Sequence, residues 1–545
     1  MLFNKLSIFL VFVFSAWSIQ CSNITIPLNK TITKGNKQLY GDFLNINKSS
    51  MIQVKFGNVN PNVSFIVFQV HSHDYNISVC NNSCVTDSTE FSTNVGFYSS
   101  VKPSIDTYYI KNDNSVNIKL YIAVHGYLER DPIPGGCNME LPVSVSPYTL
   151  ANFNKHYINV MASPAKSYDD EYCISVNSVV VKFYRMYLPE RNFDANTYFE
   201  GIKNMMTLEK IQENGQEIPM TMWGMRRMIS AYPGTGSVYV AVAYDAESDY
   251  YSVYSPTYTY ACSPLNDDCQ LLDALVSRFA CAFLIFLGVF VCYFGHRFFK
   301  TEMFLFGFIS GVVITYILIS LMAELDFSEL LGASLLSGVF FAGIWYIFWW
   351  FYGIPVIAVL LPALNLGFLV ASIFYYKLPG DTRLLMNNFN FWSLFICITI
   401  LVALILVCIA FVSNILCCSV LGAYAVVFAM DFYFGSNLKY ILINTLRRAT
   451  VPEFNWVVLA APFEWRDALV TIIWVTLSMT GFLFQHYHNR GRPPFPPPPR
   501  GMIPRIVPVT YGTLSNEYSR PGESTQNDRP LHSERTPLFV NTMSQ

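Results

Sequence analysis

The sequence is poor in charged residues. Asp, Glu, Lys and Arg make up 13% of its 545 residues, against about 25% in an average soluble domain, and the mean hydropathy is +0.33. This composition excludes an ordinary soluble fold for the whole chain. The formal net charge of -2 gives no excess of basic residues for binding nucleic acid, so no nucleic-acid partner is predicted.

Residues that support catalysis are scarce as well. The cysteines and histidines show no CxxC or HxxxH spacing, which zinc sites commonly use, and the GxSxG pattern of a serine nucleophile is absent. All eight histidines fall outside the apolar runs described next, and Asp431 is the only acid well inside one. The sequence therefore predicts a protein that is not an enzyme and that needs no metal or other cofactor.

Long apolar runs are what the chain has in abundance. Seven of them lie in residues 271–485, and each has the length of about 20 residues with which a helix crosses a hydrocarbon core of roughly 30 Å. The predicted spans are Ala274 to Phe294, Met303 to Ala323, Leu330 to Trp350, Ile354 to Tyr376, Phe391 to Val412, Ile415 to Phe434 and Ala468 to Phe484. We expect an all-α seven-helix transmembrane bundle.

The N-terminus has the pattern of a secretory signal. Residues 1–21 combine Lys5, a short apolar run and small residues before a cleavage point. The alternative, a retained membrane helix, is disfavoured because the run is short for a span. Six glycosylation sequons follow, at Asn23, Asn29, Asn47, Asn62, Asn76 and Asn81. Their clustering behind a signal predicts a glycoprotein with an extracellular or lumenal N-terminal region.

Six cysteines lie in that N-terminal region: Cys80, Cys84, Cys137, Cys173, Cys262 and Cys269. An even number in an oxidising compartment predicts disulfide bonds, although several connectivities are open. Pairing of near neighbours gives Cys80 with Cys84, Cys137 with Cys173, and Cys262 with Cys269. The cysteines within the spans are expected to be buried small apolar residues.

Strand patterns fill the region between the signal and the first span. Short runs rich in Val, Ile, Tyr and Phe, such as residues 64–72 and 237–246, alternate with Asn, Asp, Gly, Ser and Pro. They predict an all-β, disulfide-bearing ectodomain built of antiparallel β-sandwiches. A faint internal repeat divides it into two modules, residues 22–135 and 136–270.

Charge in the loops agrees with this orientation. Seven crossings from an outside start leave the tail, residues 486–545, in the cytosol. The predicted first loop is basic, with Arg297 and Lys300, and so is the start of the tail, as expected for cytosolic segments. Arg447 and Arg448, in the predicted outside loop before the last span, are exceptions.

The short loops and the polar residues of the spans bear on the class of membrane protein. Turns of about three residues are predicted around Phe351 to Gly353 and around Ser413 and Asn414. They leave little cytosolic surface to hold a G protein, which argues against a G-protein-coupled receptor. An orphan receptor not coupled to G proteins is one alternative. Pro362 and Asn365 predict a kink in the fourth span that could line a cavity. A transporter, channel or lipid scramblase is therefore the other alternative.

Small residues in the second span bear on oligomeric state. Gly307 and Gly311 form a GxxxG pattern, which lets helix backbones approach closely. Packing within the chain is favoured, and a homo-oligomer is the alternative.

The tail is polar and proline-rich, and we expect it to be disordered. Phe495 begins an FPPPP run that matches the polyproline ligand of EVH1 modules, with a stiff spacer as the equal alternative. Tyr511 and Leu514 fit a tyrosine-based sorting signal. Glu534 and Leu538 fit an acidic dileucine signal, except that Phe539 replaces its second aliphatic residue. Adaptor proteins are therefore expected partners, with residence in the plasma membrane, the endolysosomal membrane, or both.

Five stretches together resemble the transmembrane 7 superfamily member 3 family: GHRFFKTEMFLFGF (Gly295 to Phe308), YAVVFAMDFYFGSNLKYI (Tyr424 to Ile441), GRPPFPPPP, ERTPL and DPIPGGCN (Asp131 to Asn138). The membrane region is similar to that of the transmembrane protein 198 family. Phe539 departs from the family pattern, which has Leu there. The resemblance implies an association with cell survival and with attenuation of the unfolded-protein response. We expect the chain to act through binding partners, among them an unidentified extracellular ligand. The resemblance supplies no catalytic or ligand-binding residues.

Overall fold

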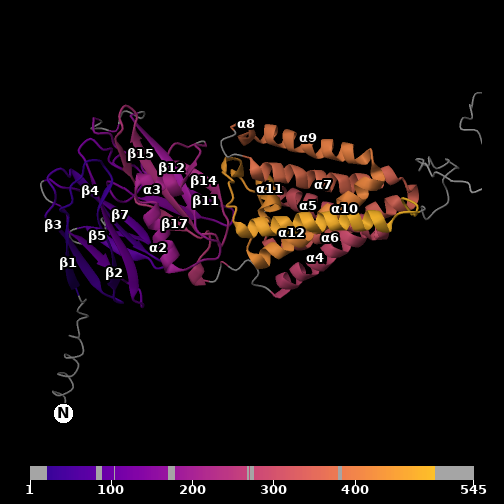
Figure 1. Cartoon of the computed structure of the whole chain (residues 1–545), viewed down its shortest axis with the longest axis horizontal. Coiled ribbons are helices and arrows are strands. Elements are labelled where there is room, and N and C mark those ends of the chain that lie inside the picture. Colours follow the sequence, from indigo (N-terminus) through magenta and orange to yellow (C-terminus); the bar gives the residue numbers. More distant parts are fainter. Residues whose placement is uncertain are drawn as a thin grey trace, which may run out of the picture. The chain divides into compact units, whose positions relative to one another are not determined.

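A computed structural model describes residues 21–81, 89–102, 105–169, 173, 178–221, 223–266, 269, 275–323, 325–378 and 383–496. Strands form the first half of the chain and long helices the second (Figure 1). The signal sequence and the sorting motifs at Tyr511, Leu514, Glu534 and Leu538 lie outside the described residues.

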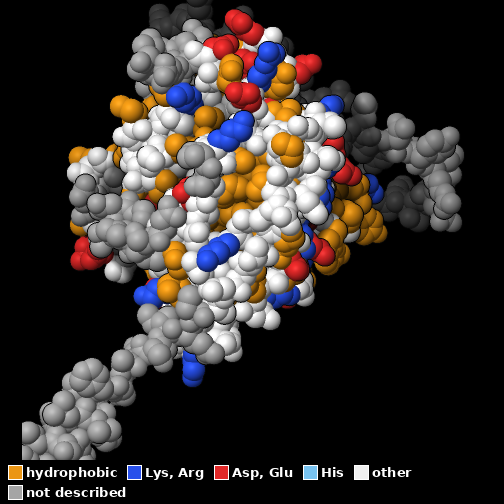
Figure 2. Space-filling model, turned by 90° about the vertical axis from the view of Figure 1, so that its left-hand side faces the viewer, with side chains coloured by type: hydrophobic (Ala, Val, Ile, Leu, Met, Phe, Trp, Pro, Cys, Tyr) orange, Lys and Arg blue, Asp and Glu red, His pale blue; other side chains and the backbone are white. Residues whose placement is uncertain are grey.

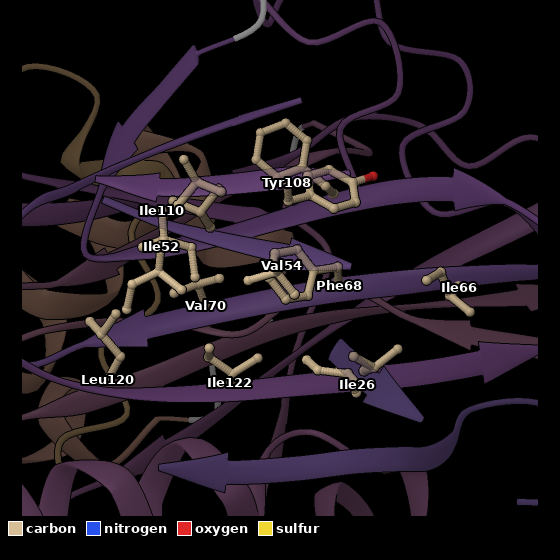
Figure 3. Close-up of a cluster of buried hydrophobic side chains, with 14 of the residues drawn as sticks. Ile26, Ile52, Val54, Ile66, Phe68, Val70, Tyr108, Ile110, Leu120 and Ile122 are labelled. Atoms are coloured by element: carbon tan, nitrogen blue, oxygen red, sulfur yellow. The ribbon is translucent and has the colours of Figure 1, made fainter. Parts of the chain in front are cut away.

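The described part of the first sandwich contains nine strands: β1 Cys21–Pro27, β2 Lys37–Ile46, β3 Met51–Gly57, β4 Phe65–Ser72, β5 Ile77–Asn81, β6 Thr89–Ser92, β7 Asn94–Ser100, β8 Tyr108–Lys111 and β9 Ile118–Tyr127. They form two sheets, with strand orders β1-β3-β8-β5-β6 and β2-β9-β4-β7. Alternate side chains of both sheets, among them Ile52, Phe68 and Tyr108, fill the core between them (Figure 3). β4 is buried at every position, because the second sandwich covers its other face.

The exposed face of the first sandwich carries charges of both signs. Lys, Arg, Asp and Glu are interspersed among uncharged side chains, and neither sign dominates the face (Figure 2). Five of the predicted glycosylation residues are exposed side chains of the first sandwich: Asn23, Asn29, Asn47, Asn62 and Asn76. Asn81, at the end of β5, is half-buried.

The second sandwich comprises β10 Thr149–Phe153, β11 Tyr157–Ala162, β12 Val179–Tyr187, β13 Gln216–Ile218, β14 Arg226–Ser230, β15 Ser237–Asp245, β16 Tyr251–Val253 and β17 Thr257–Thr259. One sheet has the order β10-β11-β14 and the other β13-β12-β15-β16, with β17 also paired to β15. The chain joins Cys137 to Cys173 and Cys262 to Cys269, as predicted from proximity. Cys80 is also disulfide-bonded, and Cys84 lies outside the described residues.

Two helices of the second sandwich, α2 Ala195–Asn204 and α3 Leu208–Asn214, were not predicted. α2 buries Tyr198, Phe199 and Ile202 in a cluster that includes Tyr121 of β9 and Val240 of β15. The two sandwiches therefore share a buried apolar cluster, in which apolar area is removed from water on both sides of the helix.

The helical domain contains seven helices long and apolar enough to cross a membrane among the described residues: α4 Leu275–Phe294, α5 Phe299–Met322, α6 Phe327–Tyr352, α7 Pro355–Lys377, α9 Asn388–Val407, α10 Ala410–Phe434 and α12 Trp465–His488. Shorter elements are η2 Pro264–Asn266, η3 His296–Phe298, α8 Arg383–Met386, α11 Tyr440–Thr450 and η4 Phe454–Trp456. One end of the helical domain, residues 435–464, contacts the second sandwich. We call the opposite end, which contains residues 295–299, 408–409 and 489–496, the tail end.

Both predicted tight turns are present, but the second lies earlier in the chain than predicted, between Val407 and Ala410. α6 ends at Tyr352, Gly353 adopts a left-handed φ of 58°, and α7 begins at Pro355. α10, in contrast, already begins at Ala410, so that Asn414 lies inside a helix instead of in a turn. Its amide nitrogen is bonded to Glu302 and His296, described below, and these partners reduce the usual reason for an asparagine to favour a turn.

The GxxxG residues of α5 pack within the chain. A Cβ atom added to Gly311 would lie 2.7 Å from the Cβ of Phe341 and 3.0 Å from the Cα of Gly338, both on α6. A Cβ atom on Gly307 would lie 3.0 Å from the Cα of Ala342. The absence of side chains is therefore what allows α5 and α6 to approach so closely.

Candidate functional site

The second sandwich and the helical domain are joined by backbone hydrogen bonds. The Ser230 N–H donates to the Val458 carbonyl oxygen at 3.0 Å, and the Val458 N–H donates to the Met228 carbonyl oxygen at 2.9 Å. The segment after η4 thus continues the edge of β14. We call the contact between the second sandwich and the helical domain the junction. It consists of these backbone bonds and of the polar side chains of both domains described in the next three paragraphs.

Arg447 of α11 provides the main polar side chain of the junction. Its guanidinium donates to the Ala231 carbonyl oxygen at 2.9 Å and to the Lys155 carbonyl oxygen at 3.0 Å. Tyr232 donates from its hydroxyl to the Leu459 carbonyl oxygen at 2.6 Å. Burial lowers the pKa of Arg447, but a guanidinium keeps its charge well above neutral pH.

A second contact of the junction is made by Arg191, which follows β12. Its guanidinium donates to the carbonyl oxygens of Tyr433 at 3.1 Å and Phe432 at 2.9 Å, at the C-terminus of α10. A cation is favourable there because the last carbonyl groups of a helix lack intrahelical partners. Arg191 itself has a φ of 53°, and this local strain is held in place by the contact.

Buried acidic side chains also lie in the junction, near the C-terminus of α10 that Arg191 contacts. Asp431 accepts from the Lys439 N–H at 2.5 Å, and Asp467 accepts from the Asn437 N–H at 2.6 Å. Glu190 is 5% exposed, and burial raises the pKa of its carboxyl group to about 7 against the opposing effect of Lys439. Burial likewise lowers the pKa of Lys439. These groups form a buried network that both domains share.

A second polar cluster lies at the tail end, inside the helical domain. The Asn414 amide nitrogen lies 2.9 Å from Glu302 Oε2 and 2.9 Å from His296 Nδ1. Gln485 of α12 accepts from the His296 N–H at 3.0 Å. All four residues are buried. We call them the tail-end cluster, and it ties α5, η3, α10 and α12 together.

The sequence analysis missed the tail-end cluster. His296 was placed in a loop, Glu302 one residue outside the second span, and Asn414 in a turn. All three lie at the edges of apolar runs, where a shift of one helical turn decides between solvent and interior. The signal in the sequence that could have predicted this cluster is the presence of polar residues at the ends of two or more apolar runs.

Phe495 also lies at the tail end. Its ring packs against Phe299 with a centroid distance of 5.4 Å and against His296 with a distance of 5.8 Å. The side chain is half-buried. The predicted polyproline motif therefore begins at a residue in contact with the helices.

The fourth-span residues singled out in the sequence lie against α5. Asn365 accepts from the Ser310 hydroxyl at 3.0 Å and donates to the Phe306 carbonyl oxygen at 3.4 Å. Pro362 is buried within α7. The amide of Asn365 thus has partners on both its oxygen and its nitrogen, and both partners hold α7 against α5.

No group of three or more His, Cys, Asp and Glu side chains among the described residues has the arrangement to hold a metal ion. The acids of the junction instead accept from backbone amides. This chemistry fixes helix ends and loops.

Three family models match successive parts of the chain. The TM7SF3-like, N-terminal immunoglobulin-like domain matches residues 36–127, and the TM7SF3-like, second immunoglobulin-like domain matches residues 132–265. The TM7S3/TM198-like domain matches residues 281–486. The chain belongs to the transmembrane 7 superfamily member 3 family.

Relatives named Transmembrane 7 superfamily member 3 match nearly the whole chain. The protein from Mus musculus is 28% identical over 527 residues, covering 91% of this chain and 93% of the relative. The protein from Homo sapiens is 29% identical over 459 residues, covering 81% and 80%. The two sandwiches are thus the immunoglobulin-like domains of the transmembrane 7 superfamily member 3 family, and the helical domain is its multi-pass membrane region.

Proposed function

We propose that this chain is a non-catalytic membrane glycoprotein that acts by binding partners, in the cell survival and attenuation of the unfolded-protein response associated with its family. The junction is the observation that carries the proposal. Arg447 of the helical domain donates to Ala231 of the second immunoglobulin-like domain, and Arg191 donates in the opposite direction to Phe432. A partner bound to the immunoglobulin-like domains therefore acts on the helices through these contacts.

The proposed orientation places the immunoglobulin-like domains outside the cell or in a lumen, and the tail in the cytosol. It is supported by the exposure of five sequon asparagines on one domain and by disulfide bonds such as Cys137 to Cys173, which form in oxidising compartments. An odd number of crossings then puts the tail on the other side of the membrane.

A binding role fits the buried acids better than catalysis does. Asp431 and Asp467 accept from backbone N–H groups, and Glu302 lies beside the amide of Asn414. Groups used in this way hold helix ends and neighbouring helices together. The transport alternative depends on Asn365, whose amide is already bonded to α5, and Asn365→Leu leaving a measured lipid or ion flux unchanged would remove it.

The experiment compares wild type with Arg447→Gln in cells that lack the endogenous relative and are treated to cause endoplasmic-reticulum stress. We expect wild type to restore survival and Arg447→Gln to restore much less at equal abundance, because the junction transmits the binding event. Arg130→Gln, at an exposed side chain of the first domain, is the matched control. Equal rescue by all three proteins would contradict a role for the junction.

Proximity labelling in the same cells tests the partner-binding part. Labels fused to the N-terminal region and to the tail should each enrich a distinct set of proteins on opposite sides of the membrane. If none of the six sequons carried a glycan, the proposed orientation itself would be contradicted.

A further inference from the structure

The helical domain carries a socket at its tail end. Phe299 and Met303 of α5, Trp349 of α6 and Ala358 of α7 form a buried apolar cluster, and Phe495 packs against it from the segment after α12. The rings of Phe495 and Phe299 meet at 67°. This edge-to-face geometry is the one that aromatic pairs prefer.

The rim of the socket is polar and is held by residues of the helices. His296 Nδ1 faces the Asn414 amide nitrogen at 2.9 Å, so Nδ1 accepts and Nε2 carries the proton. The His296 ring packs against the Phe495 ring with a centroid distance of 5.8 Å. Asn414 is held in turn by Glu302, so residues of the helices themselves orient the His296 ring.

A turn after α12 brings the tail back to the socket. Gly491 has a φ of 76°, and a Cβ atom added to it would meet no atom within 4 Å. The Arg490 and Arg492 N–H groups donate to the carbonyl oxygens of Tyr487 and Asn489. The left-handed backbone, and not space, is therefore what requires glycine at this position.

We propose that Phe495 forms a latch that occupies this socket, so that the polyproline motif is open to an aromatic-groove partner only when the latch is released. Proline restricts the free segment to extended conformations, which lowers the entropy lost on docking. Phe495 cannot contact Phe299 and a partner's groove at once. The competition with a partner rests on the proposed tail partners, while the latch itself does not.

The first test measures the latch alone in the purified full-length chain. A photoreactive benzoylphenylalanine replaces Phe495, and mass spectrometry locates the cross-links. We expect cross-links to the peptides that contain Phe299 and Trp349, and their loss in Gly491→Val. Benzoylphenylalanine at the exposed Arg492 should not give them. Identical cross-links from both positions, or none to these peptides from position 495, would overturn the latch.

The second test measures competition with an isolated EVH1 domain as the probe. A peptide of residues 488–510 should bind it roughly tenfold more tightly than the full-length chain does, if the latch is open about a tenth of the time. Gly491→Val should bring the full-length chain close to the peptide's affinity. The matched control is Gly332→Val in α6, which also has no atom within 4 Å of an added Cβ and which should change nothing.

The outcomes of these tests distinguish the latch from its competition with a tail partner. Equal affinity of peptide and wild-type chain would overturn the competition. Failure of the EVH1 domain to bind even the peptide would overturn that class of tail partner, and the cross-links would then decide the latch by themselves.

Discussion

Arg447 and Ala231, 216 positions apart in the sequence, are joined by a 2.9 Å hydrogen bond from the guanidinium to the carbonyl oxygen. In the proposed orientation, Arg447 lies in an outside loop before the last span, where basic residues are normally disfavoured. This bond accounts for the presence of an arginine there. Its charge is used in the junction with the second immunoglobulin-like domain, where three backbone and hydroxyl oxygens accept from it: Ala231, Lys155 and Ser230.

Replacement of Arg447 by Gln should destabilise the junction. The shorter amide cannot reach all three acceptors, so buried carbonyl oxygens lose their partners at a cost of about 3 kcal/mol. We expect a lower thermal midpoint of the full-length chain in detergent micelles and faster proteolysis of the N-terminal region. Arg130→Gln, at an exposed site, should leave the midpoint unchanged, and an equal loss from both variants would show that the buried bonds contribute nothing specific.

Glu190 should make the junction sensitive to pH. Its pKa is raised to about 7 because burial penalises the charged form, so the folded chain holds this proton more tightly than the unfolded chain does. The contribution to stability is complete below the ordinary value of 4.5 and is lost as the pH rises through about 7, by on the order of 1–2 kcal/mol once screening is included. The charged groups that face Glu190 are Lys439, Asp467, Arg191 and Arg466.

Hydrogen exchange of residues around Glu190 checks this pH dependence. Protection factors should fall between roughly pH 5 and pH 8 in wild type and stay constant in Glu190→Gln, which is neutral throughout. Glu200→Gln, at an exposed position of α2, should behave as wild type. A Glu190→Gln variant that still loses protection with rising pH would assign the effect to another group.

Gly311 and Gly343 should respond in opposite ways to the same change. Gly311→Ala puts a methyl group 2.7 Å from Phe341 Cβ, which forces α5 and α6 apart at a cost of about 1–3 kcal/mol. Gly343→Ala meets no atom within 4 Å and should stabilise α6 by about 0.5–1 kcal/mol. Thermal midpoints of the two variants, measured in one detergent, test this prediction. If Gly343→Ala lowered the midpoint as much as Gly311→Ala, close packing of α5 against α6 would not explain the effect.

The spans were predictable from the sequence because their signal is local. A run of apolar residues specifies a membrane helix whatever its neighbours are, and the turn at Gly353 follows from a glycine with a proline two residues later. The strands of the sandwiches were predictable for the same reason. α2 was not, because its helix is stabilised by burying Tyr198 and Phe199 against distant strands, and its own propensity gives little sign of that.

The polar sites depend on partners that are far apart in the sequence. Asn414 between two apolar runs has the pattern of a turn, and only Glu302 and His296, more than a hundred residues earlier, make its place inside α10 favourable. Arg447 likewise finds its acceptors in another domain. Periodicity and composition describe a residue's neighbours in the chain, so such contacts need the three-dimensional structure.

Two buried histidines should make the first immunoglobulin-like domain sensitive to acid. Burial lowers the pKa of His71 to about 4 and that of His125 to about 3, so folding favours their neutral forms. Their contribution to stability is complete above the ordinary value of 6.5 and is lost as the pH falls, by about 2 kcal/mol for each histidine at roughly pH 5. Protection of the β4 and β9 amides from hydrogen exchange should therefore fall between roughly pH 7.5 and pH 5. His125→Phe should keep more of it, since both ring nitrogens of His125 lack hydrogen-bond partners among the described residues and an apolar ring of similar size has no proton to take up. Equal acid sensitivity of wild type and His125→Phe would exclude His125 as the titrating group.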